Sequence, residues 1–379
     1  MTPMKFDLDQ PYLEVQQQAR ELGGRIDSMA AAADESSEVH AGVLAALRAS
    51  GLARMMVPAA FGGRSEQLDP LAICVAREAL MATSSHADSL FALQGIGSYA
   101  ITMAGTPEQR ALWLPRVARV EALAALALTE PDAGSDLKMV STELVTTGDG
   151  LLLRGSKSFI SNGKGASFYT VFAKEGAGFS MVLVPAGTAG VSVTATPELI
   201  APHELGEITF KDVVLPHSAR LGVPGNGIDL VLATLGIFRV SVAGAAVGLA
   251  QAALEEAVRH TRVRRQFGRP LARLGPVAQL LADSWTEIEM ARLLTYRAAF
   301  RAIGDPAAAL PHSSMAKLAA TEMASRVVDR CVQVMGRFGL IRGSKIERLY
   351  RQARPMRIYE GASEVLRLGI ARELTRVIP

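Results

Sequence analysis

Three short segments of the chain combine charged or hydroxyl side chains with glycine, a mixture that suits chemistry. The first, LTEPDAGSD (128–136), presents the hydroxyls of Thr129 and Ser135 on a turn that contains proline. Hydroxyl and backbone N–H groups arranged in this way bind planar heterocycles or phosphates. The same residues also suit an ordinary turn with Asx and Ser/Thr caps, and local chemistry alone favours that simpler interpretation.

The second segment, RVRRQFGRP (262–270), gathers arginines at the end of a predicted long helix. Guanidinium groups bind pyrophosphates, but cations also favour the C-terminus of a helix because of its dipole. The third segment, MRIYEGASEV (356–365), places Glu360 in an apolar approach to the last helix. Desolvation raises the pKa of such a carboxyl group and makes it a general base, although Glu360 and Ser363 also suit a helix N-terminus.

The composition excludes several classes of protein. The 379 residues carry 40 basic and 37 acidic side chains, spread along the chain, so nothing favours a nucleic-acid partner. Cys74 and Cys331 lie far apart and no residues have metal-ligand spacing, so neither a disulfide framework nor a metal site is predicted. The six histidines are scattered and receive no catalytic role.

No window reaches the ~18–20 apolar residues of a membrane span, and the N-terminus resembles neither a secretory signal nor a transit peptide. These features predict a soluble cytoplasmic protein. The length predicts two or three packed units.

Helical periodicity extends from about residue 13 to residue 125. The serine pair before Glu38 suits an N-cap, and Gly51 suits the end of that helix. Residues 69–105 predict two helices that meet at the serine pair 84–85, and residues 106–118 predict a short capped helix.

Short alternating runs bounded by Gly, Pro or Asp replace this pattern in residues 140–216 and predict a small antiparallel β domain. Helices then return. One long helix is predicted in residues 227–268, hydrophobic around much of its circumference and therefore buried in a bundle or at a subunit contact. Three more helices are predicted, in residues 275–304, 312–338 and 361–377. The absence of βαβ alternation argues against a doubly wound nucleotide fold.

In this order, the segments resemble the acyl-CoA dehydrogenase family over essentially the whole chain. Six motifs carry the resemblance, and their shared order makes it stronger than any one of them. They are VPAAFGG (57–63), LTEPDAGSD (128–136), KSFISNG (157–163), RRQFG (264–268), QVMGRFG (333–339) and IYEGASEV (358–365).

The resemblance implies an α+β, mainly α fold with three domains. They would be an N-terminal helical domain (1–125), a small antiparallel β-barrel-like domain (126–222) and a C-terminal four-helix bundle (223–379). It also implies FAD as the cofactor, a homo-oligomer built as a dimer of dimers, and an electron-transfer flavoprotein as the partner that accepts electrons.

The resemblance assigns flavin contacts to residues in five segments. Within one subunit these would be Leu126, Leu128, Thr129, Ser135, Phe159, Ser161, Ala362 and Glu364, and for the flavin of a neighbouring subunit Arg264, Gln266, Phe267, Gln333 and Gly336. It assigns substrate contacts to Ser135, Tyr359, Gly361 and Asp88. A solvated aspartate in the first turn of a helix is the simpler interpretation of Asp88.

The implied reaction is the α,β-dehydrogenation of an acyl thioester, acyl-CoA to trans-2-enoyl-CoA. Glu360 would remove the α-proton, its backbone N–H would polarise the thioester carbonyl, and FAD would take the β-hydride. Some relatives carry the base on the long helix near Arg239, but TLGIFRV (234–240) contains no carboxylate. Arg239 itself matches a family arginine below the active site, and a buried structural cation is the alternative.

The chain departs from the family pattern at several positions. Ala362 stands where threonine is usual, Gly275 where glutamine is usual, and Arg337 and Phe338 where glycine and asparagine are usual. The segment APHELGEITF (201–210) replaces one that normally carries an arginine and a serine. Other interpretations therefore stay open: a dehydrogenase for acyl or aminoacyl groups on a carrier protein, a flavin oxidase or monooxygenase, and a scaffold without flavin.

Overall fold

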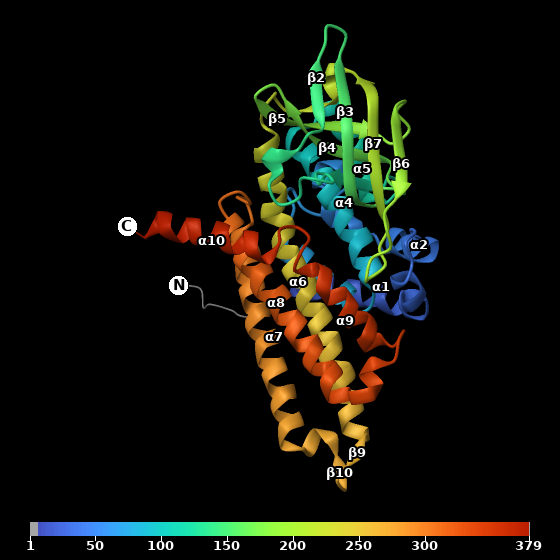
Figure 1. The fold of residues 1–379 in the computed structure, drawn as a ribbon, viewed down its shortest axis with the longest axis vertical. Coiled ribbons are helices and arrows are strands. Elements are labelled where there is room, and N and C mark those ends of the chain that lie inside the picture. The colour runs from blue at the N-terminus through green and yellow to red at the C-terminus, as the bar shows by residue number, and fades with distance from the viewer. Residues whose placement is uncertain (1–6, 379) are drawn as a thin grey trace. The chain divides into compact units, whose positions relative to one another are not determined.

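The computed structural model describes residues 7–378 of the chain (Figure 1). These residues separate into two compact units, each built from separate stretches of sequence. The first unit comprises Met1–Asp34, Pro70–Asp88 and Gly236–Pro379, and the second comprises Glu35–Asp69 and Ser89–Leu235. The start of the N-terminal stretch used to predict localisation, residues 1–6, lies outside the described residues. The predicted domain boundaries after residues 125 and 222 remain predictions.

The first unit is helical. In it α1 packs on α3, α3 on α7, and α8 contacts α7, α9 and α10. Its helices are α1 (Gln10–Asp34), α3 (Pro70–Met81), α7 (Gly275–Arg301), α8 (Leu310–Met335), α9 (Lys345–Met356) and α10 (Ser363–Val377), with the short hairpin β9 (Arg265–Gln266) and β10 (Arg269–Pro270). The division between the units falls within α4 (Ser85–Ala104) and α6 (Gly227–Val263), so each of these helices contributes to both.

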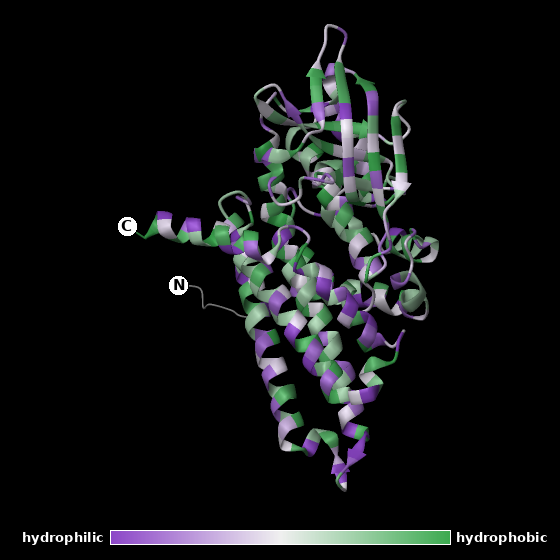
Figure 2. Cartoon of the chain, viewed as in Figure 1, coloured by the Kyte–Doolittle hydropathy of each residue, from purple (hydrophilic) through white to green (hydrophobic). Residues whose placement is uncertain are grey.

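The second unit is built around an eight-stranded sheet, with α2 (Ala41–Ser50) and α5 (Pro107–Ala118) in the same unit. The strand order is β6-β7-β3-β2-β4-β5-β8, and β1 pairs with β4. The strands are β1 (Ala124–Ala127), β2 (Glu143–Thr146), β3 (Leu151–Ser161), β4 (Phe168–Glu175), β5 (Gly178–Pro185), β6 (Val191–Ala195), β7 (Leu205–Leu215) and β8 (Arg220–Leu221). Along much of β7, buried and exposed residues alternate, so one face of the strand lies in the core. Figure 2 shows hydrophobic and hydrophilic residues interspersed along the strands of this sheet.

The predicted fold class is confirmed: helices, a central sheet and more helices follow one another along the chain. The sheet is antiparallel except where β4 pairs with β1 and β2. The predicted end of the second helix at Gly51 is confirmed by its left-handed backbone, φ 66°. The capped helix is confirmed as α5, where Thr106 and Gln109 form a capping box.

Three local predictions were wrong. The N-cap of α2 is His40, whose Nδ1 accepts from the N–H of Val43, while Ser36 forms a local turn with Glu38. Ala124 and Ala125, the first residues of β1, were included in the predicted helical region, but they lie in a buried strand beside β4 because packing overrides local preference. The amphipathic helix α9 was not predicted, since its basic residues obscure a narrow apolar side.

Helix α6 is long and apolar enough, by length and composition alone, to cross a membrane. However, 89% of the residues in its most apolar window are buried within the structure, which is the pattern of a core helix. The sequence prediction of a buried long helix is confirmed, although α6 ends at Val263 because residues 265–270 form the β9–β10 hairpin.

Close packing of α6 on α3 depends on two glycines. A Cβ atom on Gly248 would lie 2.0 Å from the carbonyl oxygen of Glu78, and one on Gly244 would lie 2.6 Å from that of Cys74. Contacts this short force the helices apart, so only glycine permits the observed packing.

We expect Gly248→Ala to lower the free energy of unfolding by about 1–3 kcal/mol, because the new methyl group overlaps the α3 backbone. Gly24→Ala on the exposed side of α1 is the matched control, since open space surrounds that position. The control should stabilise the protein by about 0.5–1 kcal/mol through helix propensity. Urea unfolding of both variants measures this, and equal effects would contradict the packing argument.

Candidate active site

Glu360 lies in the turn between α9 and α10, and its backbone is left-handed, with φ 52°. Gly361 follows with φ 111°, and a Cβ atom there would lie 3.0 Å from Cδ2 of Leu366 and 3.1 Å from a guanidinium nitrogen of Arg239. A non-glycine residue with positive φ is uncommon, and such strain gathers at functional sites. The turn therefore needs support from its surroundings.

Two cations hold the carbonyl groups of this turn. Nε of Arg239, on α6, donates to the carbonyl oxygen of Glu360 at 2.8 Å. Nζ of Lys317, on α8, donates to the carbonyl oxygen of Gly361 at 2.7 Å. The side chain of Lys317 is fully buried, and nothing in its helical context distinguished it in the sequence.

The donor and acceptor groups of Glu360 itself are largely unused. Oε2 of its carboxylate is buried and accepts no hydrogen bond from residues 7–378. Within the same range, no residue accepts a hydrogen bond from its backbone N–H. A carboxylate and an N–H group are thus both available to a bound molecule.

A buried ion pair lies in the same unit. Nε and Nη2 of Arg77 donate to the two carboxylate oxygens of Asp88 at 2.9 and 2.7 Å, and Nη1 donates to Oγ of Ser241 at 2.8 Å. Asp88 is only 4% exposed, so the interpretation of it as a solvated first-turn aspartate was wrong. Arg77 neutralises it, and no sequence motif indicated that partner.

Burial and the neighbouring charges act on the pKa of the Glu360 carboxyl in opposite directions. Burial raises the pKa of the Glu360 carboxyl, Asp88 adds to this effect, and Arg77, Lys317 and Arg239 only partly reverse it. Oε2 of this carboxyl is buried, although the residue as a whole is half-buried and its neighbour Tyr359 is 39% exposed. A desolvated carboxyl group with a raised pKa is suited to act as a general base near neutral pH.

The turn LTEPDAGSD in the second unit is organised by Glu130. Its buried carboxylate accepts hydrogen bonds from Nζ of Lys157 at 2.9 Å, from both the N–H and the hydroxyl of Ser141, and from the N–H of Thr142. Lys157 also donates to the carbonyl of Leu128 at 2.9 Å. Burial alone would raise the pKa of Glu130, but these hydrogen bonds lower it to about 2. The carboxylate therefore has a structural role.

The flavin residues predicted in the second unit lie on this frame. Strand β1, which carries Leu126, has a single sheet neighbour among the described strands, β4, so its other edge can bond to a ligand. Leu128 and Thr129 follow it half-buried, and Ser135 is exposed.

At the end of β3 an irregularity in the ladder turns Phe159 outward, with φ 54° and 49% of the residue exposed. Ser161 then returns to the ladder opposite Leu205. Oγ of Ser161 lies 3.0 Å from Nε2 of His203, a histidine to which the sequence analysis gave no role. Burial lowers the pKa of His203 to about 4, so its imidazole is neutral at neutral pH. Its position in the unusual APHELGEITF segment was the only signal in the sequence.

A third group of predicted residues lies where α6 ends. Arg264 and Arg337 lie 5.7 and 5.1 Å from the centre of the Phe338 ring, and His260 contacts the same ring. The nearby Gln333, Gly336 and Gln266 are exposed, and Phe267 is 87% exposed. Arg264 comes directly after the last residue of α6, Val263, which lies 24 residues beyond Arg239, about 36 Å at 1.5 Å per residue. This group is therefore distant from the Glu360 turn within one chain.

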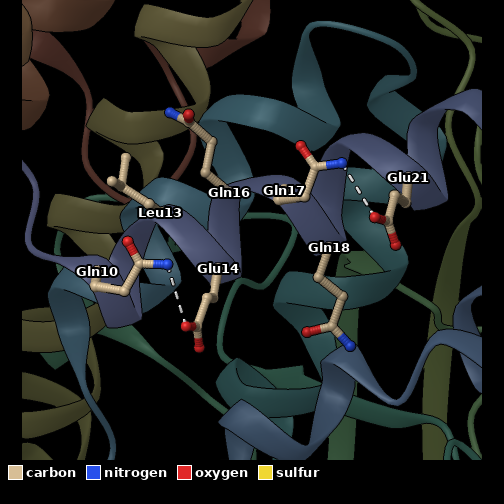
Figure 3. Close-up of a pocket in the computed structure, with 7 residues that line it drawn as sticks. All are labelled: Gln10, Leu13, Glu14, Gln16, Gln17, Gln18 and Glu21. Carbon is tan, nitrogen blue, oxygen red and sulfur yellow. Dashed lines mark hydrogen bonds between the residues drawn. The ribbon is translucent and has the colours of Figure 1, made fainter.

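The structure brings Arg239, Tyr359, Glu360 and Gly361 together in the first unit, with Asp88 in their electrostatic environment. Ala362 and Glu364 follow at the start of α10, and Glu364 is exposed. Among residues 7–378, no three His, Cys, Asp or Glu side chains are grouped as metal ligands. The hollow along α1 (Figure 3) is lined by side chains of that helix, Leu13 and six glutamines and glutamates, with Gln10–Glu14 and Gln17–Glu21 hydrogen bonds, and contains none of the predicted residues.

Comparison with known proteins identifies similar chains along the whole length. Residues 12–121, 125–213 and 225–375 match the family profiles described as the N-terminal, middle and C-terminal domains of acyl-CoA dehydrogenase. Cyclohexane-1-carbonyl-CoA dehydrogenase of Geobacter metallireducens is 32% identical over 369 residues, 96% of each chain.

Two solved structures are also similar. One, described as the electron transferring flavoprotein of Acidaminococcus fermentans, matches with a TM-score of 0.92 and 30% identity over 98% of this chain and 100% of that one. The other, a glutaryl-CoA dehydrogenase from Mycobacterium smegmatis in complex with FADH2, has a TM-score of 0.91 and 26% identity over 98% and 96% of the two chains.

We expect Glu130→Gln to lower the free energy of unfolding by about 3–5 kcal/mol at pH 7, because the buried Lys157 loses its carboxylate partner. The pKa of Glu130 is lowered to about 2, so its contribution is complete above the ordinary pKa of 4.5 and is lost as the pH falls toward 2. The difference between the two proteins in urea unfolding should therefore shrink from pH 7 to pH 3. A constant difference would contradict the ion-pair account.

Proposed function

Because the chain belongs to the acyl-CoA dehydrogenase family, we propose that it converts an acyl-CoA thioester to its trans-2-enoyl thioester, with Glu360 as the base. The observation that carries this proposal is the unpaired Oε2 of Glu360, which is buried near three cations and not bonded to any of them. The family consists of FAD-dependent oxidoreductases that act on CH–CH bonds, and this chain shares that class and cofactor.

The residues present fit FAD. The free edge of β1, the hydroxyls of Thr129 and Ser161 and the outward ring of Phe159 are groups that suit a flavin ring. The exposed Ser135 suits a phosphate or the thioester arm. When bound, FAD supplies an acceptor for the β-hydride of the substrate.

Glu360 would receive the α-proton on its carboxylate. The acidity of that proton depends on polarisation of the thioester carbonyl, and the unused N–H of Glu360 is a donor that would stabilise developing enolate charge. Tyr359 and Gly361 would contact the acyl thioester on either side of the base. Arg239 would keep the turn in place through the carbonyl of Glu360.

The proposal extends to partners and assembly. Similarity to a chain from a structure described as an electron transferring flavoprotein supports such a protein as the electron acceptor. A homo-oligomer is supported by the apolar side chains of α7 that remain exposed, among them Trp285, Leu293 and Phe300. We propose a dimer of dimers in the cytoplasm.

Anaerobic titration of the purified protein with a panel of acyl thioesters tests the reaction. The panel should include a cyclohexane-1-carbonyl thioester, because a relative is named for that substrate. We expect one ester to bleach the flavin, with a rate that rises with pH because the raised pKa of Glu360 delays its deprotonation. Glu360→Gln should retain yellow FAD, and the rate at which an ester bleaches its flavin should be at least about 10³-fold lower.

The other outcomes discriminate between functions. Bleaching by carrier-protein thioesters but not by CoA esters would indicate a biosynthetic acyl or aminoacyl dehydrogenase. Rapid reoxidation in air would indicate an oxidase or monooxygenase. Wild-type bleaching by Glu360→Gln would exclude Glu360 as the base.

Most of the length of α6 separates Arg264 from Arg239, so Arg264 is too far away to serve the Glu360 turn of its own chain. This separation allows a test of whether each active site contains residues of two subunits. If Arg264 serves the flavin of a neighbouring subunit, Arg264→Ala and Glu360→Gln subunits should each be inactive alone and active when co-expressed. In the mixed oligomer one site then has an intact base and receives an intact Arg264 from its neighbour. Absence of such rescue, with light scattering confirming mixed oligomers, would place Arg264 outside the neighbour's site.

A further inference from the structure

Lys317 is the residue of the Glu360 surroundings that neither motif nor resemblance assigned. Its side chain is fully buried on α8, and its Nζ donates to the carbonyl oxygen of Gly361 at 2.7 Å. Among the described residues it forms no ion pair within 4.0 Å, although Glu360, Glu322 and Glu364 attract its charge and Arg239 repels it. Its direct partner is a neutral carbonyl group.

Such an arrangement is costly if packing is the only purpose. A buried ammonium group loses its hydration, and a leucine or methionine would fill the same position on α8 without that loss. Burial accordingly lowers the pKa of Lys317 to about 8. The position therefore calls for an explanation in terms of the group that the lysine holds.

That group is the second of two successive carbonyls in a strained turn. Glu360 and Gly361 both have positive φ, and Arg239 holds the carbonyl before the one that Lys317 holds. A hydrogen bond from a charged donor is stronger than a neutral one. With both carbonyls bonded in this way, neither of the two peptide planes that follow the Cα of Glu360 can rotate freely. The N–H of Glu360 belongs to the preceding peptide, and no backbone carbonyl of the described residues accepts a hydrogen bond from it.

We propose that Lys317 is a positioning residue for Glu360, which fixes the peptide after Gly361 so that the carboxylate and the N–H of Glu360 keep their orientation toward a thioester. This inference rests on the proposed function, because it assumes that Glu360 is the base. It assigns to Lys317 no contact with substrate. The loss of Lys317 should therefore affect chemistry more than thioester binding.

Lys317→Met tests the proposal, because methionine fills a similar volume without a donor. Arg330→Met is the matched control: it removes a cation from the same helix, one that pairs with Glu287 instead of the turn. The first readout needs no substrate. Hydrogen exchange should be faster at the amide of Ser363, which donates to the carbonyl of Arg357, in Lys317→Met and unchanged in the control.

The second readout is the absorbance shift of a chromophoric enoyl thioester on binding, which reports polarisation of its carbonyl. The third is the rate of flavin reduction. In Lys317→Met we expect a smaller absorbance shift and flavin reduction about 10- to 100-fold slower. The thioester concentration that gives half the maximal rate should change less than about twofold. If Lys317→Met does not fold, Lys317→Gln serves instead, because it keeps a donor but removes the charge.

The proposal would be overturned if a folded Lys317→Met protein kept the wild-type values of amide exchange, absorbance shift and flavin reduction rate. Lys317 would then be a packing residue. A lower melting temperature with the same three readouts unchanged would do the same. Failure of every thioester to reduce the wild-type flavin would instead refute the proposed function. In that case the exchange at Ser363 still decides whether Lys317 holds the turn.

Discussion

The constraint on which the proposed active site depends is a carboxylate kept near cations without being paired to them. Arg77 donates hydrogen bonds to Asp88 and Ser241. Arg239 donates to the carbonyl oxygen of Glu360, and Lys317 donates to that of Gly361. Their positive charges still attract the carboxylate of Glu360 and favour its ionised form. Since none of them bonds its Oε2, the pKa of Glu360 stays raised. A direct ion pair would lower that pKa and weaken the base.

Glu130 shows the opposite outcome with the same residue types. It is also a buried glutamate beside a buried lysine, but every neighbouring donor bonds directly to it and its pKa falls to about 2. The difference lies in where the donors point, because both carboxylates lose hydration on burial. One environment keeps the carboxyl suited to the base that we propose, and the other makes a turn that presents Thr129 and Ser135.

The sequence revealed those parts of the site that lie in short motifs. Glu360, Thr129 and Ser161 each lie within two residues of a glycine or proline, where residue type carries a local signal. Lys317 and Arg77 lie inside helices, and their roles depend on partners more than 40 and 10 residues away. The order of helices, strands and helices followed from periodicity, whereas β1 and the cap of α2 were decided by packing and by a histidine acceptor. Such partners are set by tertiary structure, which periodicity does not report.

The departures from the family pattern are also better understood from the structure. Arg337 and Phe338 replace small and polar residues, and they do not leave a gap: the Phe338 ring contacts His260 and lies near Arg264 and Arg337. Two cations repel one another, but the face of an aromatic ring attracts both and can hold them close together. The substitution thus adds a positive charge beside Arg264 and a surface that positions both. A phosphate group would be attracted more strongly there than to Arg264 alone, so these departures are compatible with a site for the flavin of a neighbouring subunit.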